Sequence, residues 1–206
     1  METPEPQDPL KERKDLLSRL YDSQPSFRYS VTLDTHIVSF HRGEFFDAAT
    51  ASPWKIAYRA FRLMWVSDAF FAQVAYRARL RLRAKGVPVI PRLLHKLSMI
   101  TSQLSIDEMV QIAPGVNIAH GQAIIGGLTS IGHGCTISPW VSIGLQAGDV
   151  HGPKIGENVF IGTGAKILGD LEIGDGAVIG SQALVTRDVP AGAIVGGIPA
   201  KVIGNK

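Results

Sequence analysis

The chain has 206 residues, of which 45% are hydrophobic, enough for a sizeable core, and its net charge of +3 is modest and indicates no nucleic-acid partner. Its single cysteine excludes an intrachain disulfide and fits a reducing compartment. The polar N-terminus METPEPQDPLKERKD lacks the apolar core of a signal peptide, and no apolar run reaches the roughly 18 residues of a membrane helix. We therefore expect a cytoplasmic protein without a membrane span.

The N-terminal third gives weak signals. Residues 1–9 are predicted to form a disordered tail, and Lys11–Leu20 a short helix. Ser23–Thr50 shows no clear pattern. This part of the chain predicts helical structure without a recognisable function.

A stronger helix is predicted after Ser67, a plausible N-cap, and should run to Lys85. Its basic residues, among them Arg77 and Arg81, could contact nucleic acid or anionic lipid, but such residues more often form a solvated face. We interpret them as a solvated face. A second helix is predicted at Pro91–Ile100, with proline in its first turn.

From Ser105 onward, an aliphatic residue recurs every six positions. The residue four positions later is mostly small or apolar, and glycine often follows the aliphatic residue directly. The repeat has one extra residue after its fourth member and a break of twelve across LQAGDVHGPK. Its members are Ile106, Ile112, Ile118, Ile124, Ile131, Ile137, Ile143, Ile155, Ile161, Ile167, Ile173, Ile179 and Val185.

This repeat predicts a solenoid in which six residues make one short strand and one turn. The aliphatic residue and the small residue four later face inward, and three units close a triangular coil of 18 residues. Coils stack about 4.8 Å apart, because only stacking buries their apolar faces. The predicted fold is mainly β, a left-handed parallel β-helix at 105–206 preceded by a largely helical region at 1–104. Cys135 is expected to fill the core.

The chain resembles hexapeptide-repeat acyltransferases, specifically serine O-acetyltransferases, from Ser67 to Gly204. The residues that carry the resemblance are VNIAHG at Val116–Gly121, the loop before PKIG at Pro153–Gly156, and FIGTGAKILGDLEIGDGAVIGSQALVTRDVPAGAIVGGIPAKVIG at Phe160–Gly204. The resemblance implies acetyl-CoA or another acyl-CoA as cosubstrate, no metal, a small-molecule acceptor whose hydroxyl is acylated, and a homotrimer. Whether two trimers pair stays open.

Two histidines are candidate catalytic residues. His120 lies two positions after an inward aliphatic residue, in the turn that follows the short strand, and is expected to point outward. The family's base lies in a motif like Ile-Asp-His-Gly, which matches Ile118–Gly121, so His120 is the expected general base. The resemblance also implies that His151, in the loop before Pro153, contacts the acceptor across a subunit boundary. For both, the alternative is an exposed histidine without a function, which is our interpretation of His133.

The chain departs from the family beside the expected base. The aspartate that precedes the family's histidine is Ala119 here, and the acidic residue fifteen positions before it is Ser105. Asp107 lies two residues further along the strand and is not equivalent. The imidazole therefore lacks its usual orienting group, and serine as acceptor lacks a partner for its ammonium.

The resemblance also implies a donor site along the last coils. Thr163 and Ser181 are 18 residues apart, one coil, and are expected to stack beneath Leu145. Thr186 and Arg187 match the pair that contacts the nucleotide end in the family, and Lys201 is a further cation for its phosphates. The expected cofactor-binding residues are Thr163, Ser181, Thr186, Arg187 and Lys201.

Three alternatives remain open. The acceptor could be an amino sugar or a natural-product intermediate, acylated at nitrogen or oxygen. A non-catalytic trimeric β-helix scaffold would need none of the site residues. A metal enzyme of the γ-class carbonic anhydrase type needs three converging histidines, and the separations between His120, His133 and His151 argue against it.

Overall fold

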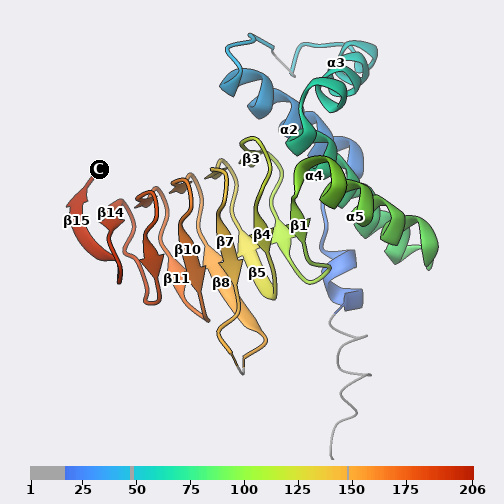
Figure 1. Ribbon diagram of the computed structural model, residues 1–206. Coiled ribbons are helices and arrows are strands. Elements are labelled where there is room, and N and C mark those ends of the chain that lie inside the picture. The colour runs from blue at the N-terminus through green and yellow to red at the C-terminus, as the bar shows by residue number, and fades with distance from the viewer. Residues whose placement is uncertain (1–16, 47–48, 148) are drawn as a thin grey trace, which may run out of the picture.

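Helices precede a parallel β-helix in the computed structural model, which describes residues 17–46, 49–147 and 149–206. Figure 1 shows the helices at one end of the β-helix and the C-terminus at the other. Residues 17–22 are helical. The tail predicted at 1–9 and the first part of the helix predicted at Lys11–Leu20 lie outside the described residues. The other helices are α2 (Phe27–His41), α3 (Pro53–Val66), α4 (Asp68–Ala84) and α5 (Val89–Ser102).

The β-helix has three flat sheets, one on each side of a triangular prism. The first sheet has the order β1-β4-β7-β10-β13, the second β2-β5-β8-β11, and the third β3-β6-β9-β12-β14-β15. The strands are β1 (Ser105–Ile106), β2 (Gln111–Ile112), β3 (Asn117–Ile118), β4 (Ile124–Ile125), β5 (Leu128–Ile131), β6 (Thr136–Ile137), β7 (Ser142–Gly144), β8 (His151–Ile155), β9 (Phe160–Ile161), β10 (Lys166–Leu168), β11 (Glu172–Ile173), β12 (Val178–Ile179), β13 (Leu184–Val185), β14 (Ala193–Gly196) and β15 (Lys201–Asn205).

The predicted parallel β-helix is confirmed, with about five coils in the described residues. Apart from β15, which is antiparallel to β14, the described strands pair in parallel. Repeat residues such as Ile137, Ile161 and Ile179 are fully buried, as are the small residues four positions later, such as Cys135 and Ala165. The six-residue repeat therefore builds the core by alternating inward and outward side chains.

One member of the predicted repeat was assigned to the wrong residue. Ile124 is 59% exposed, whereas Ile125 is buried and pairs with Ile143. The extra residue therefore lies earlier than predicted, in the turn at 119–123 that contains His120. The pattern could not distinguish two adjacent isoleucines, because either one continues the repeat.

Helix α4 closes the open end of the β-helix. The first coil donates its backbone N–H groups to the second coil, for example from Ala113 to the Ile131 carbonyl at 2.9 Å. Carbonyls of the first coil that face away from the second coil have no preceding coil, so they need donors from elsewhere. Side chains of α4 supply them: Gln73 to Val116 (2.9 Å), Tyr76 to Val110 (2.7 Å), Arg79 to Ile106 (3.1 Å), and Arg77 to Ile112 and Ala113 (2.8 Å for Ala113).

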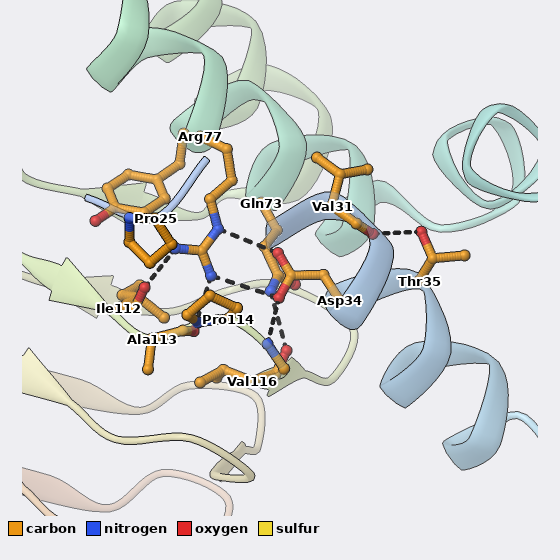
Figure 2. A network of polar contacts seen from close by, with 12 residues as sticks. Pro25, Val31, Asp34, Thr35, Gln73, Arg77, Ile112, Ala113, Pro114 and Val116 are labelled. Atoms are coloured by element: carbon orange, nitrogen blue, oxygen red, sulfur yellow. Dashed lines mark hydrogen bonds and ion pairs between the residues drawn. The ribbon is translucent and has the colours of Figure 1, made fainter. Parts of the chain in front are cut away.

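A buried ion pair fastens α2 to the same cap (Figure 2). The Asp34 carboxylate lies 3.1 Å from Arg77 Nε and accepts a 2.7 Å hydrogen bond from the Gly115 N–H, and both charged side chains are almost fully buried. Burial raises the pKa of Asp34, and the Arg77 guanidinium opposes that rise. The interpretation of Arg77 as part of a solvated face is therefore wrong, because its guanidinium binds the end of the solenoid.

The two predicted helices are confirmed with small shifts in their ends. Ser67 caps α4 by accepting a hydrogen bond from the Phe70 N–H at 3.3 Å. Helix α5 is two residues longer at each end than predicted. Helices α2 and α3 were not predicted. No helix among the described residues is long and apolar enough to cross a membrane.

Candidate active site

The expected base and two expected donor-site residues share one edge of the prism. Turns at 119–123, 138–141, 162–165 and 180–183 lead from the third sheet to the first, and we call their stack the His120 edge. His120, Thr163 and Ser181 lie in the first, third and fourth of these turns and are exposed. The Gln182 N–H donates to the Thr163 carbonyl at 2.9 Å, so the last two turns stack in register.

The turn that holds His120 has an unusual backbone. His120, Gly121 and Gln122 all lie in the left-handed region, with φ of 62°, 82° and 57°. The Gln122 N–H donates to the Ser102 carbonyl at 2.7 Å, which fixes the turn against the end of α5. Among the described residues no hydrogen bond to the His120 ring is formed, so the ring is available to take a proton from a substrate.

His151 lies on a different edge. Turns at 107–110, 126–127, 145–147 with 149–150, and 169–171 lead from the first sheet to the second, and 186–188 leads from β13 to Val189, which bridges to Ile173 of the second sheet. We call the stack of these turns the His151 edge. Figure 1 shows the connection between β7 and β8 projecting from the solenoid, and His151 is the first residue of β8. One chain therefore does not bring His120 and His151 onto the same edge.

Asp149 orients His151, a role that the sequence analysis missed. One carboxylate oxygen lies 2.9 Å from the ring Nδ1 and accepts a 2.9 Å hydrogen bond from the His151 backbone N–H. These hydrogen bonds lower the pKa of Asp149, which is exposed. The Asp-x-His spacing was the available signal, since an Asp commonly accepts a hydrogen bond from the backbone two residues later.

The predicted column beneath Leu145 is wrong. The loop adds six residues to its coil, so Ser142 pairs with Lys166, 24 residues later. The Gly164 N–H accordingly donates to the Pro139 carbonyl at 2.9 Å, and Pro139 takes the place expected for Leu145. Leu145 belongs to the His151 edge, where a Cβ added to Gly127 would lie 2.0 Å from Leu145 Cδ2.

The remaining expected donor residues divide between the two edges. Lys201 follows the loop at 197–200, which continues the His120 edge: the Leu184 N–H donates to the Gly197 carbonyl at 3.0 Å, and the Ala200 N–H to the Leu184 carbonyl at 2.8 Å. Thr186 and Arg187 directly follow β13 and lie exposed on the His151 edge. Each edge thus carries one histidine and part of the expected donor site.

Other polar groups of the solenoid have structural roles. His133 contacts the Pro114 carbonyl through Nδ1 at 2.7 Å. Cys135 is buried, as expected, and its Sγ lies 3.1 Å from the Gly156 carbonyl. Burial raises the pKa of Cys135 to about 11, so its thiol stays protonated at neutral pH. No group of three or more His, Cys, Asp or Glu residues within the described part of the chain could hold a metal ion.

A cavity of about 250 Å³ lies away from both edges. It is formed where the segment around Gln24 crosses the second sheet, and Gln111 and Ser130 contribute to its walls. None of the predicted site residues lines it. The chemistry suggested by the two histidines is therefore expected at the edges of the prism.

The hexapeptide repeat also emerges from comparison with known proteins. A family model described as bacterial transferase hexapeptide (six repeats) matches residues 152–187. The serine acetyltransferase of Synechococcus elongatus is 39% identical over 138 residues, which cover 65% of this chain and 56% of that protein. The serine acetyltransferase of Escherichia coli K12 is 36% identical over 140 residues, covering 66% and 51%. The chain spans about half the length of these curated relatives.

Solved serine acetyltransferases share the fold. The soybean enzyme in complex with serine matches 92% of this chain and 74% of its own, with a TM-score of 0.71 and 26% identity. The Brucella abortus enzyme in complex with coenzyme A matches 95% and 75%, with a TM-score of 0.73 and 22% identity. The resemblance to hexapeptide-repeat acyltransferases of the serine acetyltransferase type is confirmed, and the repeat fits the predicted left-handed winding.

Proposed function

We propose that the protein is an acetyl-CoA-dependent O-acetyltransferase of the serine acetyltransferase type, acting on a hydroxyl of a small acceptor. The distribution of residues over the two edges carries this proposal. The His120 edge presents His120, Thr163, Ser181 and Lys201, and the His151 edge presents His151 and Arg187. The named relatives support the reaction.

In this proposal His120 is the general base. Its imidazole takes the proton of the acceptor hydroxyl while the oxygen attacks the thioester carbonyl carbon. A backbone N–H stabilises the negative oxygen of the tetrahedral intermediate. When the carbon–sulfur bond breaks, the imidazolium returns its proton to the departing thiolate, so that the products are the acetyl ester and free coenzyme A.

The donor is proposed to lie along the His120 edge, with its nucleotide end toward Lys201. Four coil steps separate the His120 turn from the loop at 197–200, about 19 Å at 4.8 Å per coil. This length suits an elongated thioester. Backbone groups and the exposed Thr163 and Ser181 line the path, and Lys201 supplies a positive charge for phosphate.

We propose a homotrimer in which the His120 edge of one subunit faces the His151 edge of the next. Each chain then contributes half of three equivalent sites. Thr186 and Arg187 would approach the donor from the neighbouring subunit, and His151 would contact the acceptor. Pairing of two trimers through the helices stays open.

The acceptor is proposed to be serine, because the curated relatives are serine acetyltransferases and one solved relative was obtained with serine. A specific observation favours a second candidate, an amino sugar or natural-product intermediate acylated at oxygen or nitrogen: Ala119 and Ser105 provide no carboxylate for a substrate ammonium. The third possibility, a scaffold without activity, would leave the Asp149–His151 contact without a purpose.

The proposal also includes the division of the chain into two units and the location of the protein. The largely helical region at 1–104 and the β-helix domain at 105–206 are proposed as the two units, supported by the end of α5 at Ser102 and the start of β1 at Ser105. The proposed location is the cytoplasm, which the free, buried thiol of Cys135 supports.

Release of free thiol from acetyl-CoA tests the function, with serine, other amino acids and amino sugars as acceptors. The proposal expects thiol release that depends on serine, with formation of O-acetylserine. Release that depends only on an amino sugar would establish the second candidate. Binding of coenzyme A without thiol release for any acceptor would indicate the scaffold.

A further inference from the structure

Trp140 has a conformation that its own side chain disfavours. Its φ is 65°, and it is the only Phe, Tyr or Trp among the described residues with a positive φ. The left-handed region suits glycine, whereas a bulky residue there is strained. The indole is 55% exposed, so burial in this chain's core does not account for its presence. A strained, exposed aromatic residue beside a proposed site is a candidate for a functional role.

The backbone of Trp140 is fixed between the base and the donor path. Its N–H donates to the Gln122 carbonyl at 2.7 Å, in the turn that holds His120. Its carbonyl accepts a 2.8 Å hydrogen bond from Lys166 Nζ, which also lies 3.2 Å from Ser142 Oγ. The next turn is held through the Gly164 N–H to the Pro139 carbonyl. Trp140 is therefore one coil, about 4.8 Å, from the turns of His120 and Thr163.

The order of residues along the His120 edge places the indole at the reacting end of the donor. A donor that enters from Lys201 passes Ser181, then Thr163, and reaches the Trp140 turn before it reaches His120. The acyl group is the last part of the donor and must stop where His120 can activate the acceptor. It therefore comes to lie at the coil of Trp140.

Trp140 has the largest side chain among the residues at the equivalent position of the turns on the His120 edge. The residues at the equivalent position of the other three turns are Gln122, Gly164 and Gln182, and each of them also has a positive φ. Gly164 adds no side chain of its own, and a Cβ there would lie 2.4 Å from Gln182 Nε2. The rigid indole of Trp140 thus lies between the flexible amide side chains of Gln122 and Gln182, where it can limit the length of a bound acyl group.

We propose that Trp140 determines donor specificity by packing against the acyl group, so that acetyl fits and longer chains clash with the indole. This inference rests on the proposed acyltransferase function. It assigns a role to a residue that the sequence analysis did not select.

The chain-length profile tests the inference. Rates with acetyl-, propionyl- and butyryl-CoA would be compared for the wild type, Trp140→Gly and Trp140→Phe. Glycine accepts the backbone conformation and removes the ring, and Phe keeps a smaller ring. In the wild type each added methylene should lower kcat/KM by about 10–200-fold, as in a fitted pocket. Trp140→Gly should reduce that loss to about threefold or less, and Trp140→Phe should lie between them. Trp65→Ala, which removes an 84% exposed Trp on α3, should keep the wild-type profile.

Equilibrium binding separates this inference from the proposed function. Titrations with S-ethyl- and S-butyl-CoA, which cannot transfer their alkyl groups, should show that the wild type discriminates between them and Trp140→Gly does not. Equal discrimination by wild type and Trp140→Gly would overturn the role of Trp140 while leaving the acyltransferase intact. Loss of the trimer in Trp140→Gly, measured by sedimentation, would also overturn it, because the ring would then serve packing between subunits. Failure of the wild type to bind either compound would refute the proposed function itself.

Discussion

At the scale of single residues, the two histidines differ in what surrounds them. His120 occupies a left-handed turn beside Ala119 and has no partner for its ring among the described residues. His151 is hydrogen-bonded to Asp149. A carboxylate commonly orients a catalytic imidazole, so the assignment of His120 as the base rests on the matched motif at Ile118–Gly121 and not on the contacts of its ring.

Replacement of His120 by alanine should lower kcat by about 10²–10⁴ without weakening coenzyme A binding, because the ring transfers a proton and does not hold the donor. Steady-state kinetics and a binding titration would measure the two effects. His133→Ala is the matched control, since His133 is also exposed on the solenoid but packs against Pro114, and it should keep its kcat. Normal turnover in His120→Ala would contradict the assignment.

Asp149→Ala should raise the KM of the acceptor with little change in kcat, because His151 would lose the contact that orients its ring. The double variant with His151→Ala should be no worse than His151→Ala alone, since both changes remove one interaction. Because the pKa of Asp149 is lowered, its carboxylate stays ionised at pH values below its ordinary pKa, and this contact is lost only when the pH falls through the lowered value. Additive effects of the two substitutions would show that Asp149 acts elsewhere.

At the scale of elements, α4 acts as the cap of the solenoid. The first coil of a parallel β-helix is a sheet edge, whose outward-facing carbonyls have no neighbouring strand. Donor side chains of α4 bind these carbonyls, and arginine provides several donors in one plane. Arg77 serves two elements at once, since it binds two carbonyls of the coil and the Asp34 carboxylate of α2.

Arg77→Met should lower the free energy of unfolding by about 3–5 kcal/mol, because Asp34 would remain buried without its partner. Burial would then raise the pKa of Asp34 without opposition from Arg77. A raised carboxyl pKa gives stability at low pH that is lost as pH rises, so the deficit should be larger at pH 8 than at pH 5. Urea unfolding at both values would measure it.

Two control variants separate the loss of the Asp34–Arg77 ion pair from other effects of the substitution. Arg92→Met removes an exposed arginine from α5 and should stay within about 0.5 kcal/mol of the wild type. Asp34→Asn combined with Arg77→Met should recover part of the lost stability and remove most of the pH dependence, because neither charge of the ion pair remains. An equal deficit at both pH values would mean that lost packing, rather than the charge of Asp34, dominates.

The sequence predicted α4, α5 and the β-helix but not α2 and α3, and the reasons are physical. The buried face of α2 is largely polar, with Asp34, Thr35 and Ser39 inside, so hydrophobic periodicity could not detect it. Helix α3 was not predicted for a different reason. Its buried residues include Leu63, yet Trp54 and Trp65 are exposed, so apolar residues occur on more than one face.

The candidate site was predictable as a set of residues but not as an arrangement. The motif around His120 follows from the resemblance to the family, and the stacking of Thr163 with Ser181 follows from the 18-residue coil. The break of twelve already lengthens one coil from 18 to 24 residues, but the predicted column counted 18 residues from Leu145 to Thr163 across that break and so placed Leu145 on the wrong edge. Asp149 and Trp140 lie outside the periodic positions and were not selected for that reason.

At the scale of the whole molecule, the central claim is that one active site needs two chains. The His120 edge and the His151 edge belong to different corners of the same prism. A neighbour that brings its His151 edge to the His120 edge completes the set, and closed threefold symmetry repeats this contact without leaving an unpaired edge.

Mixed trimers test this claim most directly. His120→Ala and His151→Ala proteins, each assayed at low acceptor concentration, should be nearly inactive alone. Refolded together in equal amounts, they should recover about one quarter of the wild-type activity, because a random interface unites an intact His120 edge with an intact His151 edge with that frequency. If both histidines of a site came from one chain, every site would carry a defect, and the mixture would stay as inactive as its components.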